Sequence, residues 1–220
     1  MATGGPGTAR AQVAASVTVV SNDLYRGLSL SDGQPAADLT LTYDGAGGVY
    51  LGASAVGETV PRRGPRALGA IVYLGHAGRV QAGGDLDVGL QIVDYRTYGA
   101  YAGDHDAAEV YAGWVRGPVN AYLHYSPDYF NTGARTLYED LNGATPLARR
   151  WRLFGHAGVL TPLGGGRVGR ALYDVRVGVS AAFKGGEAQL SWTTTGPNPG
   201  RGGPYAQGAG VVAVGLTLLL

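Results

Sequence analysis

The sequence predicts an all-β protein: a single closed antiparallel transmembrane β-barrel of about twelve strands, with short turns at one end and longer loops at the other. Three observations support this fold class: alternation of polar with apolar residues, alternation in the lengths of the connections, and scarcity of charge. Charged residues make up 15% of the chain and hydrophobic residues 45%. Because a soluble domain carries about a quarter charged residues, this composition suits a surface that faces lipid.

Alternating polar and apolar residues mark the expected strands. Between Leu86 and Ile92, for example, every second residue is apolar and the residues between them are polar or Gly. Successive side chains of a strand point to opposite faces, so each such run has one apolar and one polar face. Several of these runs have the about 9–11 residues that a tilted strand needs to cross a bilayer. We expect strands at residues 11–20, 36–43, 48–55, 66–76, 86–95, 106–115, 119–125, 135–142, 149–159, 172–183, 187–194 and 209–219.

The connections between these strands alternate in length. Short turns are expected at 44–48, 116–118, 143–148 and 184–186, with a medium turn at 77–84. Longer loops rich in Gly, Pro and Asp are expected at 21–35, 56–65, 96–105, 126–134, 160–171 and 195–208. Outer-membrane barrels have short periplasmic turns and longer extracellular loops. An even number of strands then leaves both termini in the periplasm.

The two ends of the chain carry further signals. Residues 1–11 are expected to form a tail, and residues 12–220 the barrel domain. The tail ends in Ala-Arg-Ala, which resembles the end of a secretory signal peptide, although a plain Gly/Pro tail fits equally well. The final strand has an apolar face running from Val212 to Leu220. That face resembles the signal by which the barrel-assembly machinery recognises its clients, although the chain ends in Leu where the signal usually has an aromatic residue.

Several functional classes are disfavoured. The formal net charge of +1 gives no electrostatic footprint for nucleic acid. The chain has no Cys, which excludes thiol catalysis and a thiolate zinc site. Its four His residues lack metal-ligand spacing, and His124, Ser126 and Asp128 lie close together without a nucleophile elbow. We therefore expect no metal, no cofactor and no catalytic residue.

The polar faces of the strands are expected to line the lumen. The acidic candidates Asp87 and Glu109 lie on neighbouring strands in the middle of the chain, and three arginines lie on neighbouring strands late in it. In a ring of about twelve strands these groups would stand on different walls of the pore. One interpretation is a mixed-charge constriction that passes small polar or zwitterionic solutes; an equally good one is that the charges pair and plug the lumen. The lumen and selectivity candidates are Asp87, Glu109, Tyr111, Tyr122, His124, Arg150, Arg152, Asp174 and Arg176.

Tyrosines offer a second expectation about placement. The chain has 14 Tyr residues, and many of them lie near the ends of predicted strands. Amphipathic rings prefer the headgroup level of a bilayer, so these residues are expected to form girdles around the outside of the barrel. The expected girdle residues are Tyr25, Tyr43, Tyr95, Tyr98, Tyr101, Tyr125, Tyr129 and Tyr173.

A family resemblance enters at the first long loop, where the chain reads V-S-N-D-L-Y-R-G-L-S-L-S-D-G-Q-P-A from Val20 to Ala36. This segment resembles the opening of the TorF family of porins, also called Gcw_chp outer-membrane proteins, with Asn22, Asp23 and Leu30 as departures. Later stretches resemble the family in the same order: Glu109–Gly113, and Gly117–Val119 leading into Tyr125–Phe130. Tyr173–Ser180 also resembles the family's penultimate hairpin. The motif residues are Asp23, Tyr25, Arg26, Gly27, Ser29, Asp32, Gly33 and Pro35.

The resemblance implies an outer-membrane β-barrel of a Gram-negative bacterium with a poorly defined transport function and no catalytic residues. The function we expect is a porin-like channel for passive diffusion of small polar solutes, with the lipid bilayer and the barrel-assembly machinery as partners and a homo-oligomer as an option. The alternative is a closed barrel with a structural, surface-binding or, least expected, hydrolytic role. Within the first loop, a structural pair between Asp23 and Arg26 is favoured over a binding role.

Overall fold

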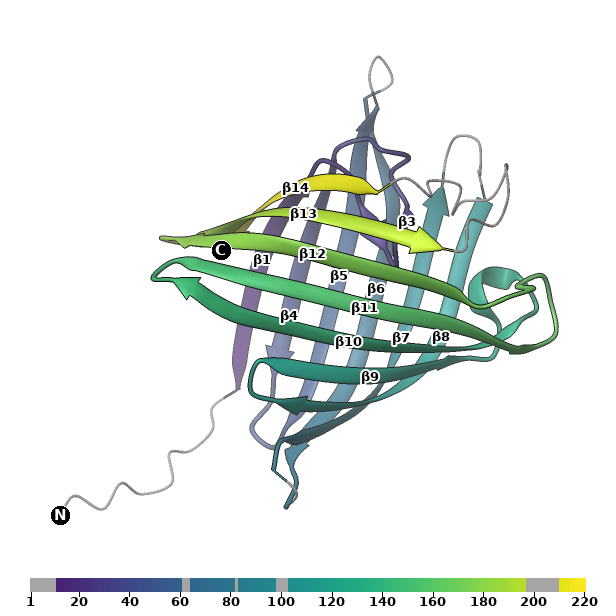
Figure 1. Ribbon diagram of the computed structural model, residues 1–220, viewed down its shortest axis with the longest axis horizontal. Coiled ribbons are helices and arrows are strands. Elements are labelled where there is room, and N and C mark those ends of the chain that lie inside the picture. Colours follow the sequence, from purple (N-terminus) through teal and green to yellow (C-terminus); the bar gives the residue numbers. More distant parts are fainter. Residues whose placement is uncertain (1–10, 61–63, 82, 98–102, 197–209) are drawn as a thin grey trace.

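The protein forms one closed antiparallel barrel (Figure 1). The computed structural model describes residues 11–60, 64–81, 83–97, 103–196 and 210–220, and in this part of the chain twelve strands close the barrel. The strands are β1 (Gln12–Val20), β4 (Ala36–Asp44), β5 (Val49–Val60), β6 (Gly64–Arg79), β7 (Asp85–Thr97), β8 (Gly103–Arg116), β9 (Val119–Ser126), β10 (Arg135–Ala148), β11 (Trp151–Gly164), β12 (Leu172–Phe183), β13 (Gly186–Gly196) and β14 (Val211–Leu219).

The first and last strands close the sheet. Val20 of β1 pairs with Ala36 of β4 on one side and with Gly215 of β14 on the other. Each remaining barrel strand pairs antiparallel with its neighbours in chain order. Closure removes the free strand edges that would otherwise invite pairing with another chain, and it confirms the predicted fold class.

The outer face of the barrel is apolar. Side chains such as Leu90, Ile92 and Val212 expose 55%, 61% and 63% of their surface. Soluble monomers rarely expose large contiguous apolar patches, whereas a belt of exposed Leu, Ile and Val matches the lipid-facing band of a transmembrane barrel. Among the described residues, no helix is long and apolar enough to cross a membrane.

The apolar belt predicts a position-dependent cost for charge. Leu90 lies in the middle of β7, so Leu90→Arg would place a guanidinium near the bilayer midplane and lower the free energy of unfolding by about 2–4 kcal/mol. Val13, close to the start of β1 and 76% exposed, provides the control. Val13→Arg is expected to cost at most about 1 kcal/mol because it lies near the interface. Denaturant titration in lipid vesicles measures the free energy of unfolding of both variants. Equal losses would contradict the placement of Leu90 near the bilayer midplane and of Val13 near the interface.

The ends of several strands differ from expectation. The predicted short turn at 143–148 is wrong, because these residues continue β10 and Thr145 pairs with Leu153 of β11. The predicted long loop at 56–65 is also wrong: β5 extends to Val60 and β6 begins at Gly64. Gly57 and Pro146 lie beside register shifts and Gly64 starts β6, positions where irregular pairing and a missing N–H donor are tolerated. All twelve predicted strands are otherwise present.

The short connections gather at one end of the barrel. The turns after β4, β6, β8, β10 and β12 lie there, together with the start of β1 and the end of β14 (Figure 1). The longer connections 21–35, 127–134 and 165–171 lie at the opposite end. The predicted tail at 1–11 and the predicted loops at 96–105 and 195–208 fall mostly or partly outside the described residues.

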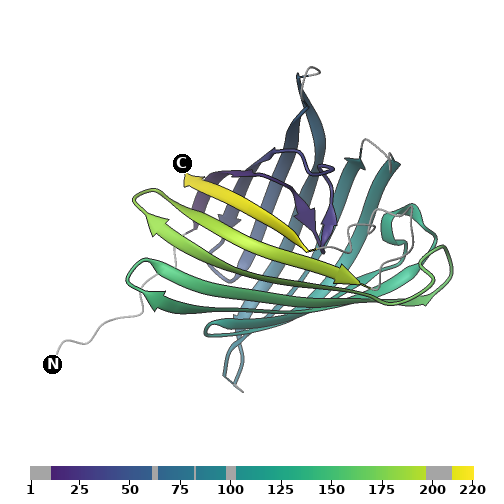
Figure 2. The same cartoon turned by 45° about the horizontal axis from the view of Figure 1, so that its top comes forward.

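The first long loop folds into the barrel instead of away from it. This inner loop, Ser21–Pro35, carries a small hairpin of β2 (Leu24–Tyr25) and β3 (Leu28–Ser29). Figure 2 shows the purple segment with this hairpin running between the front strands and the back wall. Leu28 and Leu30 are each 1% exposed and pack with Tyr129 and Phe130, which belong to the 3₁₀-helix η1 (Tyr129–Asn131) of the β9–β10 loop.

The inner loop and η1 together form what we call the apolar plug, which consists of Leu28, Leu30, Tyr129 and Phe130. With inward-facing residues of the wall, the apolar plug forms the core of the molecule. The wall residues in this cluster include Val56, Val93, Tyr95 and Leu160. The hydrophobic core of the protein therefore lies inside the barrel, toward the long-loop end.

Candidate functional site

The tip of the inner loop is a tight turn of Arg26 and Gly27. Leu24 pairs with Ser29 and Tyr25 with Leu28, so only Arg26 and Gly27 connect the two strands. Their φ angles are +49° and +74°, as a two-residue hairpin of type I′ requires at both positions. Glycine adopts this conformation freely, whereas a residue with a Cβ pays of order 1–2 kcal/mol. Arg26 therefore needs strong contacts of its own to hold this position.

Glu109 of β8 supplies those contacts. Arg26 Nη1 and Nη2 donate to Glu109 Oε1 and Oε2, each over 2.6 Å. The side chains of Arg26 and Glu109 are 8% and 1% exposed, and the guanidinium lies 4.1 Å from the centre of the Tyr138 ring. A buried bidentate pair of this kind combines charge with fixed geometry. The expected pairing of Arg26 with Asp23 is wrong, because the Arg26 guanidinium binds Glu109 across the lumen instead.

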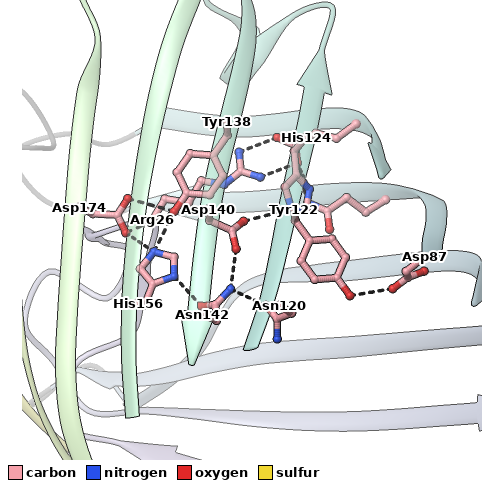
Figure 3. Close-up of polar contacts among 12 residues, drawn as sticks. Arg26, Asp87, Asn120, Tyr122, His124, Tyr138, Asp140, Asn142, His156 and Asp174 are labelled. Atoms are coloured by element: carbon pink, nitrogen blue, oxygen red, sulfur yellow. Dashed lines mark hydrogen bonds and ion pairs between the residues drawn. The ribbon is translucent and has the colours of Figure 1, made fainter. Parts of the chain in front are cut away.

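A chain of polar side chains continues from Glu109 along the wall (Figure 3). His124 lies between Glu109 and Asp140, with nitrogen–oxygen distances of 3.6 and 3.4 Å. The Asn142 side-chain amide donates to Asp140 and, over 2.9 Å, to Asn120. The chain joins residues from β8, β9 and β10 that neighbour each other in the sheet.

The chain ends at His156 and Asp174. His156 Nδ1 lies 2.7 Å from Asn142 Oδ1, and His156 Nε2 lies 2.7 Å from Asp174 Oδ1. The Tyr138 hydroxyl donates to Asp174 Oδ2 over 3.0 Å. Glu109, His124 and Asp174 were predicted to line the lumen, whereas Tyr138 and Asn142, which connect parts of this chain, were not.

Asp87 is the centre of a second polar group. The hydroxyls of Tyr50 and Tyr122 both donate to the Asp87 carboxylate, and the hydroxyls of Tyr50 and Tyr111 lie 2.6 Å apart. The rings fit because glycines lie opposite them: a Cβ added at Gly75 would lie 2.3 Å from the Tyr50 hydroxyl. A Gly opposite an aromatic residue of the neighbouring strand is a sequence pattern that could have indicated where these tyrosine rings lie.

The three arginine candidates occupy different places. Arg176 of β12 lies inside the lumen, 5.5 Å above the Phe154 ring. Arg152 of β11 forms an ion pair with Glu187 near the short-turn end, and its side chain is 53% exposed. Arg150 was expected on a strand at 149–159, but it lies in the turn between β10 and β11 because β11 begins at Trp151. The structure thus brings Arg152 and Arg176 to adjacent strands and leaves Arg150 at the rim.

A cavity of about 540 Å³ opens beside the inner loop. Its walls contain the tip of that loop, the polar chain described above and residues of the short-turn end such as Pro118 and Ala144. It therefore lies between the loop tip and that end of the barrel. Among the described residues, no group of three or more His, Cys, Asp or Glu side chains is arranged to hold a metal ion.

The remaining motif residues shape the inner loop. Ser29 donates to Asn22 Oδ1 over 2.6 Å and Ser31 donates to the same atom over 3.2 Å, so Asn22, a departure from the family motif, organises the loop. Asp32 and Gly33 adopt left-handed conformations, with φ of +52° and +76°. The carbonyl of Pro35 accepts from the Thr59 amide of β5 at the end of the loop.

The expected tyrosine girdle is only partly correct. Tyr43 and Tyr173 are exposed on the outer face. Tyr95 and Tyr129, in contrast, are 3% and 2% exposed inside the barrel, and Tyr25 packs against Tyr95 with ring centroids 6.1 Å apart. Tyr98 and Tyr101 lie outside the described residues. Strand-end position alone does not say which face a ring occupies, because that depends on one residue of register.

Asp23 is expected to make the docking of the inner loop sensitive to pH. Burial, and then the nearby carboxylates of Asp38 and Glu58, raise the pKa of Asp23 from 3.8 to about 6. Asp23 Oδ2 is buried and has no hydrogen-bond partner in the described part of the chain. The docked loop thus binds the proton more tightly than a released loop, so docking becomes more favourable as the pH falls through about 6 and less favourable as it rises.

The docked loop occupies part of the lumen, so firmer docking should reduce the flow of ions through the barrel. We therefore expect lower ion conductance at about pH 5 than at about pH 7.5. Asp23→Asn is expected to hold the loop docked at both pH values, because the amide carries no charge. Conductance in planar bilayers, measured at both pH values, checks this. A pH dependence that Asp23→Asn leaves unchanged would show that another group controls it.

The fold and the polar lumen define a class: the barrel is built like the outer-membrane porins. A KdgM porin structure matches with a TM-score of 0.56 and 11% sequence identity, covering 94% of this chain and 98% of that one. A NanC porin structure matches with a TM-score of 0.54 and 8% identity, covering 92% and 97%. No curated protein matches the sequence. Residues 5–201 match the model of the family described as "Bacterial protein of unknown function (Gcw_chp)", and the chain belongs to that family.

Proposed function

We propose that the protein is a porin-like channel of the outer membrane, through which small polar solutes diffuse passively. The observation that carries this proposal is the combination of an apolar outer belt with a polar, charged lumen that contains a cavity of about 540 Å³. A barrel that served only as an anchor would have no need for buried charges along its inner wall, since burying them is costly. The mixed charges at Asp87, Glu109, Asp174 and Arg176 would set the preference for solutes.

The similar structures support this proposal. KdgM and NanC are described as porins, and one KdgM structure is a complex with disordered oligogalacturonate. The TorF-like opening motif points to the same class. By this analogy both termini and the short turns face the periplasm, the barrel-assembly machinery inserts the chain, and the protein acts without enzymatic chemistry. A homo-oligomer remains compatible with the proposal.

A closed barrel is the second candidate, and the apolar plug favours it. Leu28, Leu30, Tyr129 and Phe130 fill the long-loop part of the lumen. Two close contacts also join charged residues inside the barrel, between Arg26 and Glu109 and between His156 and Asp174. A channel with this structure has to displace the inner loop or pass solutes beside it. A hydrolytic role has less support, because His124 contacts Glu109 and Asp140 and the buried Ser126 hydroxyl lacks a hydrogen-bond partner among the described residues.

Single-channel conductance of the refolded protein in a planar bilayer distinguishes the two candidates. Steady ohmic steps are expected of a channel, with ion selectivity given by the reversal potential. A folded barrel that never conducts would reject the channel and leave the closed barrel.

The arginines of the short-turn end are expected to tune selectivity. Replacing both Arg150 and Arg152 with Gln would leave Glu187 without its ion-pair partner at this mouth, and the reversal potential should shift toward cation preference. An unchanged reversal potential would exclude these two residues from selectivity.

A further inference from the structure

We propose that the lumen cavity is a binding site for a small hydroxylated carboxylate, such as a sugar acid, and that Arg176 binds its carboxylate. This inference rests on the proposed channel and names the class of solute. The carboxylates around the cavity already have partners, whereas Arg176 has none in the described part of the chain.

Each wall carboxylate receives hydrogen bonds from the protein itself. Glu109 accepts from Arg26 and, over 2.6 Å, from Gln91. Asp140 accepts from Asn142, and Asp174 from Tyr138. A bound cation would therefore have to displace donors that are already in place, which disfavours a cationic solute.

Arg176 differs from these residues. Its guanidinium lines the cavity and lies over the Phe154 ring, and its Nε is buried without a hydrogen-bond partner among the described residues. The other lumen arginines, Arg26 and Arg152, each have a carboxylate partner. A guanidinium presents its donors in a fork that matches a carboxylate in two parallel hydrogen bonds. The carboxylate of a bound solute could therefore fill the place that a protein carboxylate fills for Arg26 and Arg152.

His156 occupies the carboxylate that lies nearest to Arg176 in sequence. Its Nε2 lies 2.7 Å from Asp174 Oδ1, and its Nδ1 lies 2.7 Å from Asn142 Oδ1. The Tyr138 hydroxyl also donates to Asp174, over 3.0 Å. Asp174 therefore contacts His156 and Tyr138, and no ion pair joins it to Arg176 among the described residues.

The rest of the cavity suits a hydroxylated ring. About 540 Å³ lies within the range of small-molecule sites. Asn120 and Asn142 offer side-chain amides for hydroxyl groups, and the Phe154 ring offers a flat apolar face. These features together favour a sugar acid over an apolar carboxylate.

Isothermal titration of the detergent-folded barrel with D-glucuronate and with D-glucose tests the site, because the two sugars differ only at the carboxylate position. We expect glucuronate to bind the wild-type protein about tenfold or more tightly than glucose, in line with a charge-assisted hydrogen bond. Arg176→Met should abolish that preference and leave the weak binding of glucose unchanged. Arg152→Met, which removes a lumen arginine that is already paired, should retain the preference.

Arg176→Lys provides a second variant if the methionine variant fails to fold. It keeps the charge but loses the fork, so the preference should fall without disappearing. Equal binding of the two sugars by the wild-type protein, or equal losses in the Arg176 and Arg152 variants, would overturn the site. Conductance of the same preparation separates the two proposals: a silent barrel that binds glucuronate contradicts the channel alone, and a conducting barrel that shows no preference contradicts the site alone.

Discussion

Glu109→Gln is expected to release the inner loop and raise the single-channel conductance several-fold. The substitution leaves the Arg26 guanidinium buried without a counter-charge, and breaking a buried pair in this way costs about 3–5 kcal/mol. The loop can recover this energy by moving Arg26 into water, because the turn at its tip already holds Arg26 in an unfavourable left-handed conformation. Movement of the tip would also withdraw Leu28 and Leu30 from the apolar plug.

Two further variants sharpen this test. The pair of Arg79 and Asp85 at the short-turn end is exposed, with side-chain exposures of 80% and 40%, so Asp85→Asn should change conductance little. Replacing Arg26 with Met and Glu109 with Leu together should restore the closed state, because apolar residues of similar size often substitute for a buried ion pair without loss. A conductance that stays at the wild-type level in Glu109→Gln would show that the pair does not hold the loop.

Gly27→Ala is expected to have an effect of similar size through sterics alone. A Cβ at Gly27 would lie 2.0 Å from Thr195 Cγ2 and 2.8 Å from Asp174 Cβ. Both contacts belong to the barrel wall, and the φ of +74° disfavours a side chain in addition. The tip of the inner loop therefore has to leave the wall of β12 and β13, which should open the lumen and increase conductance.

Gly33→Ala is the matched control for this variant. Gly33 belongs to the same loop and has a φ of +76°, but a Cβ there would have nothing within 4 Å. The control thus carries the backbone strain of order 1 kcal/mol without the clash, and its conductance should stay close to that of the wild-type protein. Equal conductances for the two variants would show that backbone strain, and not the contact with Thr195, governs the position of the loop.

The strands were predictable because their signal is local. The alternation of polar and apolar residues has the two-residue period of a strand wherever one face meets lipid and the other meets water. The errors occurred where Gly and Pro interrupt this signal. At 56–65 and 143–148 they suggest loops or turns, yet the ladder continues to Val60, resumes at Gly64 and runs through 143–148, because hydrogen bonds to neighbouring strands outweigh the local preference.

The candidate site was predictable only in part. The alternation of inner and outer faces along a strand predicts that charged residues such as Glu109 and Asp174 point inward. The Arg26-Gly27 pair between apolar residues is a local turn signal. The partner of Arg26 could not be predicted from local patterns, because Glu109 lies 83 residues further along the chain. No local pattern states whether a polar loop extends into water or folds into the lumen.

The sequence by itself determined the barrel: its strands, their inner and outer faces, and the end at which the short turns gather. These properties depend on residues close together in the chain and on the contrast between lipid and water. Tertiary structure alone decided which lumen charges pair, that the first loop turns inward, and that Arg176 forms no ion pair with any residue the structure describes. The physical reason is that closing the barrel brings side chains from distant strands within hydrogen-bond reach, and the register of the whole sheet selects which of them meet.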